Sequence, residues 1–324
     1  MIPKLSWLWI MPHFESAVSP NYLYFLIVNY NSSKLVARLI NSFQLGSQVG
    51  YRTVIVNNSP DDQNIYKLTS DRTKIIEATE NLGFGKACNL GLTWIYQQNS
   101  QAIVWLINPD AYFESDIDKA ISLSDRTSQT EFGVSGRSNL AIAFFHRHPQ
   151  ISILGTTVYN SQGQITSAGG IFTPKTAALA TIYSLPKDLK QDYIKTDWVS
   201  GCSLLINLAN FDRCPQFDPR YFLYYEDLDF CLRYGQQGHQ IAVTHLLKVI
   251  HDTSSITDRH ILSKYQHITH SYLIHLEKYA GLPTFGLTNI RMLLNTLRLL
   301  FIKPQQGLGK LFGIYNYWRI RLLH

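Results

Sequence analysis

The sequence predicts an α/β fold with a mostly parallel central sheet flanked by helices. Short apolar runs alternate with segments of helical spacing, and each run stops at polar residues. Of the 324 residues, 45% are hydrophobic and 16% are charged. This composition supports a sizeable core and excludes a disordered chain.

The first part of the chain alternates between strands and helices. The run YLYFLIVN at 22–29 is apolar throughout, as is typical of a strand covered on both faces. Asn, Asp and Pro follow the apolar runs and end the strands. Strands are expected at Tyr22–Asn29, Tyr51–Val56, Ile75–Ala78 and Ala102–Ile107, and helices at Lys34–Phe43 and Lys86–Gln98. The polar loops should then meet at one sheet edge, where such folds bind ligands.

The second part is less regular, and residues 125–150 are expected to form an insertion or mobile loop. Further strands are predicted at Ile153–Tyr159, Trp198–Ile206, Ile241–Thr244 and Lys248–His251, followed by a helix at Ser263–Tyr279. The start of the chain shows no small-residue cleavage site, so we expect a non-secretory extension at 1–20. No run is long enough to span a membrane, and we expect a cytoplasmic protein.

The C-terminal stretch 285–324 is basic and amphipathic. Its six basic residues equal the net charge of +6, and it holds no Asp or Glu. Because it is also rich in Leu, Ile, Phe, Tyr and Trp, we expect contact with the inner face of an anionic membrane and no nucleic-acid partner. The alternative is a pair of helices packed on the same chain or on a second subunit, so a homodimer stays open.

The cysteines do not point to a structural metal. Cys88, Cys202, Cys214 and Cys231 form no CxxC pair, and their scatter suggests buried free thiols in a reducing compartment.

Two acidic motifs are candidates for catalysis. In Asn108-Pro109-Asp110, a hydrophobic strand delivers a carboxylate into a stiff turn, where it suits a hard divalent cation or simply caps the next helix. In Glu226-Asp227-x-Asp229, three acids lie in an aromatic stretch, where burial raises proton affinity as a general base requires. On a helix, Glu226 and Asp229 share a face and Asp227 points elsewhere. The alternative to a catalytic role is a structural one, in which these acids form the first turn of a helix and interact favourably with its dipole.

Two other segments carry weaker signals. The glycines between Asn81 and Gly91 allow close approach of the backbone to an anion, but their spacing is not that of a P-loop. His251 follows a strand and is either a metal ligand or a structural histidine.

Taken in order, the segments resemble family 2 glycosyltransferases of the inverting GT-A type, a Rossmann-like nucleotide-diphospho-sugar transferase fold, nearest the rhamnosyltransferase-like branch. Seven segments between residues 22 and 255 carry the resemblance: VNYN at 28–31, VNNSPDD at 56–62, ENLGFGKACNLG at 80–91, LINPDA at 106–111, WVSGCSLLI at 198–206, FDPRYFLYYEDLDFCLR at 217–233 and VIHDTSS at 249–255.

The resemblance implies a role for each site residue. Asp227 would be the catalytic base with Glu226 in support, and Asp110 with His251 would hold Mg²⁺ or Mn²⁺. The donor nucleotide sugar would be bound by Asn29, Tyr30, Asn31, Asn57, Ser59, Asn81, Gly83, Phe84, Gly85, Asn89, Asn108 and Asp110. Trp198, Gly201 and Asp229 would border the donor sugar and the acceptor.

Two departures from the family pattern bear on these roles. Asn57 stands where the family commonly has Asp, and it can hydrogen-bond a base but carries no charge. Asn108 replaces the first acid of the DxD-type motif, so Asp110 is the single acidic ligand and metal affinity should depend on bound nucleotide.

The resemblance also implies an organisation and an activity. It divides the chain into a GT-A domain at 21–262, with a nucleotide-binding half at 21–111 and an acceptor half at 112–262, and a C-terminal helical region at 263–324. The expected enzyme moves rhamnose or another hexose from a dTDP- or UDP-sugar to a hydroxyl of a glycan or lipid-linked glycan in cell-surface polysaccharide synthesis. A nucleotide-sugar-binding module without transfer activity and a sugar nucleotidyltransferase remain as alternatives.

Overall fold

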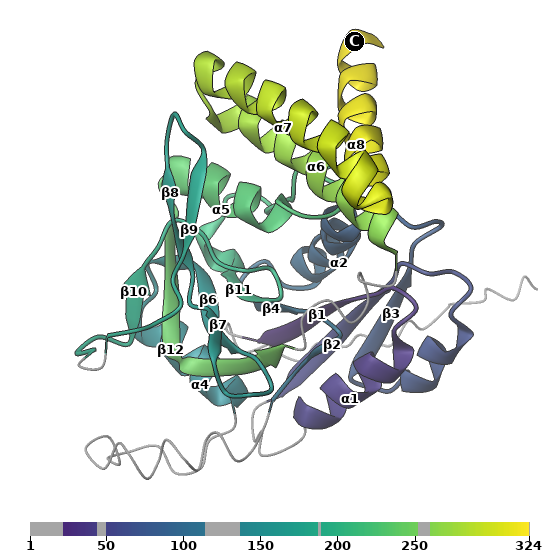
Figure 1. The fold of residues 1–324 in the computed structure, drawn as a ribbon. Helices are drawn as coiled ribbons and strands as arrows, with labels where there is room; N and C mark the ends of the chain where they lie inside the picture. Colours follow the sequence, from purple (N-terminus) through teal and green to yellow (C-terminus); the bar gives the residue numbers. More distant parts are fainter. Residues whose placement is uncertain (1–21, 44–49, 114–136, 187–188, 252–259, 324) are drawn as a thin grey trace, which may run out of the picture.

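The computed structural model describes residues 22–43, 50–113, 137–186, 189–251 and 260–323. Four parallel strands form its first half, in the order β3-β2-β1-β4 (Figure 1). They are β1 (Leu23–Asn29), β2 (Tyr51–Asn57), β3 (Thr73–Glu77) and β4 (Ile103–Ile107). Helix α1 (Ser33–Phe43), the 3₁₀ helix η1 (Gln63–Leu68) and helix α2 (Phe84–Gln98) connect them. These strands and helices confirm the predicted alternation within a few residues.

The second half of the sheet is mixed. β11 (Ser203–Asn207) lies antiparallel between β4 and β6 (Ile151–Tyr159), and β12 (Gln240–His251) runs parallel to β6. Short strands complete this half: β5 (Ala111–Tyr112), β7 (Ile165–Ser167) and β10 (Tyr193–Lys195), beside a separate hairpin of β8 (Gly170–Thr173) and β9 (Ala178–Thr181). The 3₁₀ helix η2 (Leu208–Asn210) follows β11.

Three sequence predictions need correction. The strand expected from Trp198 begins only at Ser203, because residues 198–202 form a loop. The two closing strands form one strand, β12, with a register shift between Thr244 and Lys248. The stretch expected to be irregular contains α4 (Arg137–Arg147), whose apolar residues form a contiguous run, LAIAFF, that hides its helical period. The part of that stretch before residue 137 lies outside the described residues.

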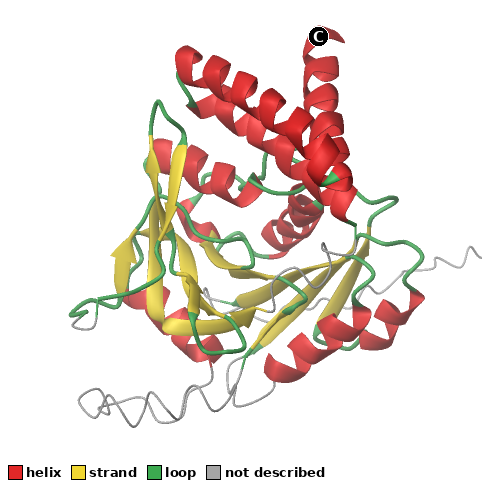
Figure 2. Cartoon of the chain, viewed as in Figure 1, coloured by secondary structure: helices red, strands yellow, loops and turns green. Residues whose placement is uncertain are grey.

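Helices cover both faces of the sheet (Figure 2). α1 and α4 lie on one face, and α2 and α5 (Glu226–Gln236) lie on the other. Because successive strand residues point to opposite faces, Leu26 and Phe25 belong to different core clusters. A strand buried on both sides is apolar at every position, which explains the continuous hydrophobic runs of the sequence.

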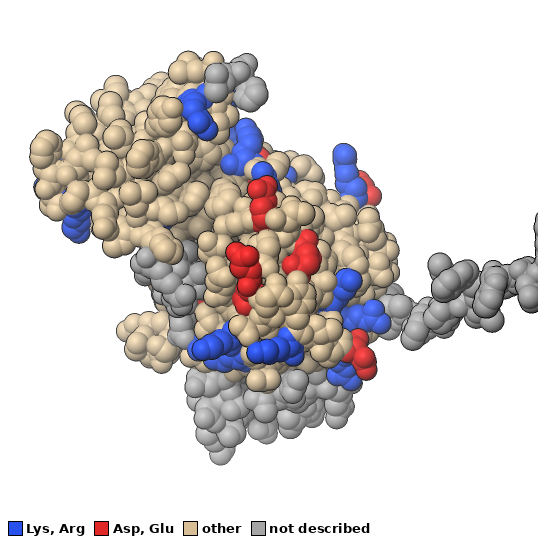
Figure 3. Space-filling view, turned by 90° about the vertical axis from the view of Figure 1, so that its right-hand side faces the viewer, with Lys and Arg blue, Asp and Glu red and all other residues tan. Residues whose placement is uncertain are grey.

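Three helices follow the sheet: α6 (Ile261–Tyr279), α7 (Leu282–Ile302) and α8 (Pro304–Leu323). They form the upper lobe of the molecule in Figures 1 and 3. α8 packs closely along α6, and a Cβ added to Gly309 would lie 2.4 Å from the carbonyl oxygen of Leu262. Within the described residues, none of the helices is both long and apolar enough to cross a bilayer.

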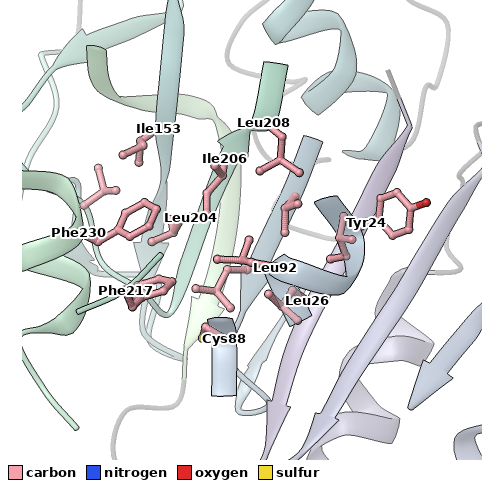
Figure 4. Close-up of a cluster of buried hydrophobic side chains, with 14 of the residues drawn as sticks. Tyr24, Leu26, Cys88, Leu92, Ile153, Leu204, Ile206, Leu208, Phe217 and Phe230 are labelled. Atoms are coloured by element: carbon pink, nitrogen blue, oxygen red, sulfur yellow. The ribbon is translucent and has the colours of Figure 1, made fainter. Parts of the chain in front are cut away.

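The core beneath α2 and α5 joins the two halves of the sheet (Figure 4). Leu26 and Leu92 from the parallel half meet Leu204, Phe217 and Phe230 from the mixed half.

The four cysteines are free, with Cys88, Cys202 and Cys231 buried and Cys214 half-buried. Burial raises the pKa of the Cys202 thiol to about 12. The hydrophobic core beneath α2 and α5 fixes the positions of β1, β2, β4 and β12 relative to α5.

Candidate active site

Polar loops from separate strands meet at the carboxyl edge of the parallel half. β1 and β2 pair in register up to Asn29 and Asn57, so the loops that follow them start side by side. A pocket of about 470 Å³ opens there, between these loops, the segment before α5 and the start of α6. Ten residues predicted from the sequence line this pocket: Tyr30, Asn81, Gly83, Phe84, Asn108, Asp110, Gly201, Glu226, Asp227 and His251.

One corner of the pocket joins the ends of β4 and β12. β5 pairs with the end of β12, with Ala111 opposite His251, and this pairing places Nε2 of His251 3.0 Å from Oδ1 of Asp110. Both side chains are largely buried. Next to them, the buried Oδ1 of Asn108 has no hydrogen-bond partner among the described residues.

This corner suits a divalent cation held jointly with a ligand. Nowhere in the described chain do three His, Cys, Asp or Glu side chains gather as a metal site. The corner offers one carboxylate, one imidazole and the orphaned amide oxygen of Asn108. Mg²⁺ is commonly held by one or two carboxylates together with phosphate oxygens, so this donor set fits a cation that binds with a nucleoside diphosphate.

The first turn of α5 supplies two acids. Tyr224 and Tyr225 both have a φ of 69°, in the left-handed region that side chains other than glycine rarely occupy. Such strain clusters at functional sites. The turn directs Glu226 and Asp227 to the pocket wall.

The two acids differ in their partners. Asp227 accepts hydrogen bonds from the backbone N–H of Gly201 at 2.7 Å and of Leu228 at 2.8 Å. Oε2 of Glu226 is buried and has no hydrogen-bond partner among the described residues. Burial raises the pKa of Asp227, although these backbone hydrogen bonds oppose the shift. Burial, with the charge of Asp227 as a smaller cause, raises the pKa of Glu226 well above its ordinary value. Either carboxylate therefore holds a proton more readily than in water.

Comparison with known proteins identifies the architecture. No family model matches the chain. It is 21% identical over 230 residues to the low-salt glycan biosynthesis hexosyltransferase Agl10 of Haloferax volcanii, covering 70% of this chain and 66% of that protein. It is 23% identical over 273 residues to an N-acetylglucosaminyl-diphospho-decaprenol L-rhamnosyltransferase of Mycobacterium tuberculosis, covering 78% of this chain and 84% of that protein. A crystal structure of GalNAc-T7 with UDP, GalNAc and Mn²⁺ matches with a TM-score of 0.51 and 12% identity, covering 71% of this chain and 43% of that one.

The chain is related to family 2 glycosyltransferases of the GT-A fold. It spans 66% of the length of the Haloferax relative. The predicted fold class is thus confirmed, with the C-terminal helices α6, α7 and α8 appended to the GT-A core.

Several predicted nucleotide-binding residues of this GT-A core lie behind the pocket wall. Asn29 donates to Oδ1 of Asn57 at 3.0 Å and to Asp62 at 3.1 Å, and both asparagines are fully buried. Asn31 donates its N–H to Oγ of Ser59 at 2.9 Å. Because these groups bond to one another, the structure places them as the frame of the strand-end loops rather than as lining.

The glycine loop is held by a similar frame. Gly83 has a φ of +79°, and a Cβ on it would lie 2.2 Å from the carbonyl oxygen of Phe222. Asn89 also lies off the pocket, because it donates to the carbonyl of Phe217 at 2.9 Å and accepts from its N–H at 2.7 Å. Gly85 packs against Phe217 at the base of the same loop.

Two residues expected at the sugar lie elsewhere. Asp229 is fully buried and bonds to Arg233 at 2.7 Å, to Tyr279 at 2.9 Å and to Lys278. Two helix positions separate Asp229 from Asp227, a turn of about 200° around α5, so Asp229 faces α6. Trp198 pairs through its backbone with Gly170 and packs against the core, and it does not line the pocket.

Parts of the pocket lining were not among the residues predicted from the sequence, and they include the start of α6, the segment 222–225 before α5, and Asn58. His260, Ser263, Lys264 and His267 at the start of α6 line the pocket, and His267 stacks on Phe222 with ring centroids 4.5 Å apart. Asn58 also lines it and donates to Oδ1 of Asn81 at 3.0 Å. Asn58 lies inside the quoted loop VNNSPDD, which was the available signal. No local pattern in α6 indicates that the helix returns to the sheet edge.

Proposed function

We propose that this chain is an inverting glycosyltransferase that moves rhamnose or another hexose from a nucleotide sugar to a hydroxyl of a glycan or lipid-linked glycan. One observation carries the proposal: Asp110 and Asp227, far apart in sequence, line the same pocket of a GT-A fold. The relatives named as a glycan-building hexosyltransferase and a rhamnosyltransferase support it.

In the proposed reaction, Asp227 takes the proton of the acceptor hydroxyl as that oxygen attacks the anomeric carbon. The bond from the anomeric carbon to the diphosphate breaks on the opposite side, its electron pair leaves with the nucleoside diphosphate, and the configuration inverts. The N–H groups of Gly201 and Leu228 hold the carboxylate in one orientation. The raised pKa of Asp227 makes it a better proton acceptor than an exposed aspartate.

Asp110, His251 and Oδ1 of Asn108 are the groups that would hold Mg²⁺ or Mn²⁺ in this pocket. A divalent cation there would neutralise charge on the departing diphosphate. Because the donor set is small, we expect the metal and the nucleotide to bind together.

The proposed donor side is the loop region around Tyr30, Asn58, Asn81 and Phe84, which offers amide groups and an exposed ring to a base and ribose. A dTDP-sugar is the first candidate and a UDP-sugar the second. The α6 wall with Lys264 and His267 belongs to the proposed acceptor side, so the region after residue 262 takes part in the site. An acceptor on a lipid diphosphate, as in the name of the mycobacterial relative, would place the protein at the cytoplasmic face of a membrane.

The test is the conservative variant Asp227→Asn. We expect transfer to fall by about 100-fold or more, the usual contribution of a general base, with nucleotide binding retained. The control is Asp71→Asn, at an exposed turn before the amino end of β3 and so at the opposite end of that strand from the pocket loops, which should leave transfer unchanged. Unchanged turnover in Asp227→Asn would remove the assignment of the base.

A panel of dTDP- and UDP-sugars, followed by thermal shift with and without Mn²⁺ or Mg²⁺, identifies the donor. Consumption of a sugar 1-phosphate with a nucleoside triphosphate would instead indicate a nucleotidyltransferase. Binding of a nucleotide sugar without transfer to any hydroxyl acceptor would indicate a binding module.

A further inference from the structure

Helix α7 has an apolar face that nothing in the described chain covers. Its side chains are exposed at intervals of three and four residues: Leu287 by 55%, Ile290 by 60%, Leu294 by 62%, Leu297 by 46% and Phe301 by 91%. At 100° per residue, these positions fall within one stripe along the helix. Exposed apolar stripes of this size are uncommon on soluble proteins and mark interaction surfaces.

The opposite side of α7 faces the protein. Thr296 is fully buried, and Phe285 and Met292 pack against the small core that contains Tyr317 of α8. The helix is therefore anchored on one side and bare on the other. Its apolar stripe is not a surface left by a poorly docked helix.

Basic residues flank this stripe. Arg291 and Arg298 are exposed, and each lies one helical step from the apolar positions Ile290 and Leu297. Lys303 is exposed just beyond the end of α7, and no Asp or Glu occurs from residue 285 onward. Figure 3 shows the upper lobe as a broad uncharged surface with a few blue basic groups.

We infer that this face of α7, defined by Leu287, Ile290, Leu294, Leu297 and Phe301, binds an anionic membrane surface. The helix lies flat, with the apolar stripe among the acyl chains and the arginines at the phosphates, as amphipathic helices with basic flanks do. A second copy of the chain fits less well. A symmetric pairing of two such faces would bring like charges together with no acid on α7 to offset them.

Membrane contact through α7 would also set the position of the pocket relative to the membrane, a point that rests on the proposed function. α7 packs on α8, α8 packs on α6, and the start of α6 lines the pocket. A membrane held at α7 is thereby held at a fixed position relative to the pocket. An acceptor carried on a membrane lipid would be presented at that wall.

The test is flotation of the full chain with vesicles of phosphatidylcholine alone and of phosphatidylcholine mixed with phosphatidylglycerol. We expect binding to the mixed vesicles that weakens as salt is added. The triple variant Ile290→Ser, Leu294→Ser, Leu297→Ser should lower the partition coefficient by about tenfold or more. The pair Arg291→Gln, Arg298→Gln should lower it about tenfold on anionic vesicles only.

Two matched control variants test whether binding comes from this face or from nonspecific hydrophobic or electrostatic adsorption to the vesicles. Ile171→Ser with Leu179→Ser removes exposed apolar side chains from the β8–β9 hairpin, and Lys34→Gln with Lys74→Gln removes two exposed cations elsewhere. Neither pair should change vesicle binding. Failure of the wild-type chain to float, or equal flotation of the triple variant, would overturn the inference. A dimer that the triple variant dissociates, without vesicle binding, would instead make the face a subunit interface.

The outcome is independent of catalysis. Nucleotide binding by thermal shift should be unchanged in all α7 variants, because none of the substituted residues lines the pocket. Loss of vesicle binding with intact nucleotide binding concerns the membrane face alone, whereas inactivity of Asp227→Asn concerns the site alone.

Discussion

Nε2 of His251 lies 3.0 Å from Oδ1 of Asp110, although 141 positions separate the two residues in the chain. The contact exists because β5, directly after Asp110, pairs with the last residues of β12. It joins the parallel half of the sheet to the mixed half at the pocket. The orphaned Oδ1 of Asn108 completes the polar corner.

The first prediction concerns metal dependence. If this corner holds a divalent cation, the variants Asp110→Asn and His251→Ala should lose the additional stabilisation by nucleotide that Mn²⁺ or Mg²⁺ gives the wild type. We expect transfer to fall by about 100-fold, typical of lost electrostatic stabilisation of a leaving group. Thermal shift with nucleotide, with and without chelator, provides the measurement. Equal metal response in wild type and Asp110→Asn would contradict the assignment.

The second prediction concerns pH. Asp227 must be ionised to accept a proton, and burial raises its pKa above the ordinary value of 3.8. The rate should therefore fall as the pH drops through this raised pKa, so the acidic limb of kcat/KM lies above pH 3.8. Measuring kcat/KM against pH with a fast and a slow nucleotide-sugar donor separates the ionisation of the base from changes in substrate binding. A rate that stays constant down to pH 3.8 would count against Asp227 as the base.

The third prediction concerns the stability cost of Glu226. Its folded-state pKa is raised above the ordinary 4.5, so its contribution to stability is fully present below about pH 4.5 and is lost as the pH rises toward the folded-state pKa. Glu226→Gln removes this dependence and should raise the free energy of unfolding at pH 7. The gain should vanish near pH 4. Chemical denaturation at both pH values tests this, with the exposed Glu80→Gln as control.

The fourth prediction concerns the ion cluster between α5 and α6. Asp229 is fully buried among Arg233, Lys278 and Tyr279, so Asp229→Ala removes the carboxylate that these three groups share, although Lys278 keeps its ion pair with Asp218. We expect a loss of about 3–5 kcal/mol in the free energy of unfolding. Arg220→Gln, which removes a half-exposed partner of Asp218, should cost less than about 1 kcal/mol. Similar losses for the two variants would show that the cluster does not join the helices.

The fifth prediction concerns the glycine loop. Gly83→Ala combines a positive φ with a Cβ that would lie 2.2 Å from the carbonyl oxygen of Phe222, so the loop must move. Gly163→Ala is a control for a positive φ without a steric contact, because its φ is +77° and no atom lies within 4 Å of the added Cβ, whereas Gly83 also has a ψ of 177°, a combination that only glycine adopts readily. The control should lose about 1 kcal/mol from backbone strain alone. Gly83→Ala should lose more and also weaken nucleotide binding. Equal losses would show that neither the steric contact nor the backbone conformation of Gly83 adds to the cost of a positive φ.

The local pattern was enough to predict the strands and the loops that end them. β1 and β4 are buried on both faces, and this burial is written directly in their unbroken apolar runs. Asn108 and Asp110 lie at the strand end that was predicted for them. Glu226 and Asp227 lie in the first turn of α5, which the sequence analysis gave only as the alternative to a catalytic role. Helix α4 was not predicted because its buried residues Ala141, Phe144 and Phe145 belong to a continuous apolar run that shows no helical period in the sequence.

The sequence by itself determined the GT-A core and the order of its polar segments, because alternation of apolar runs and polar turns is a local property of the chain. Only the tertiary structure decided which side chains reach the pocket. Helical rotation turns Asp227 into it and Asp229 away, and long-range strand pairing brings His251 to Asp110. Packing of α8 on α6 completes the wall at His267. Such placement depends on contacts between residues far apart in the chain, which no short stretch of sequence encodes.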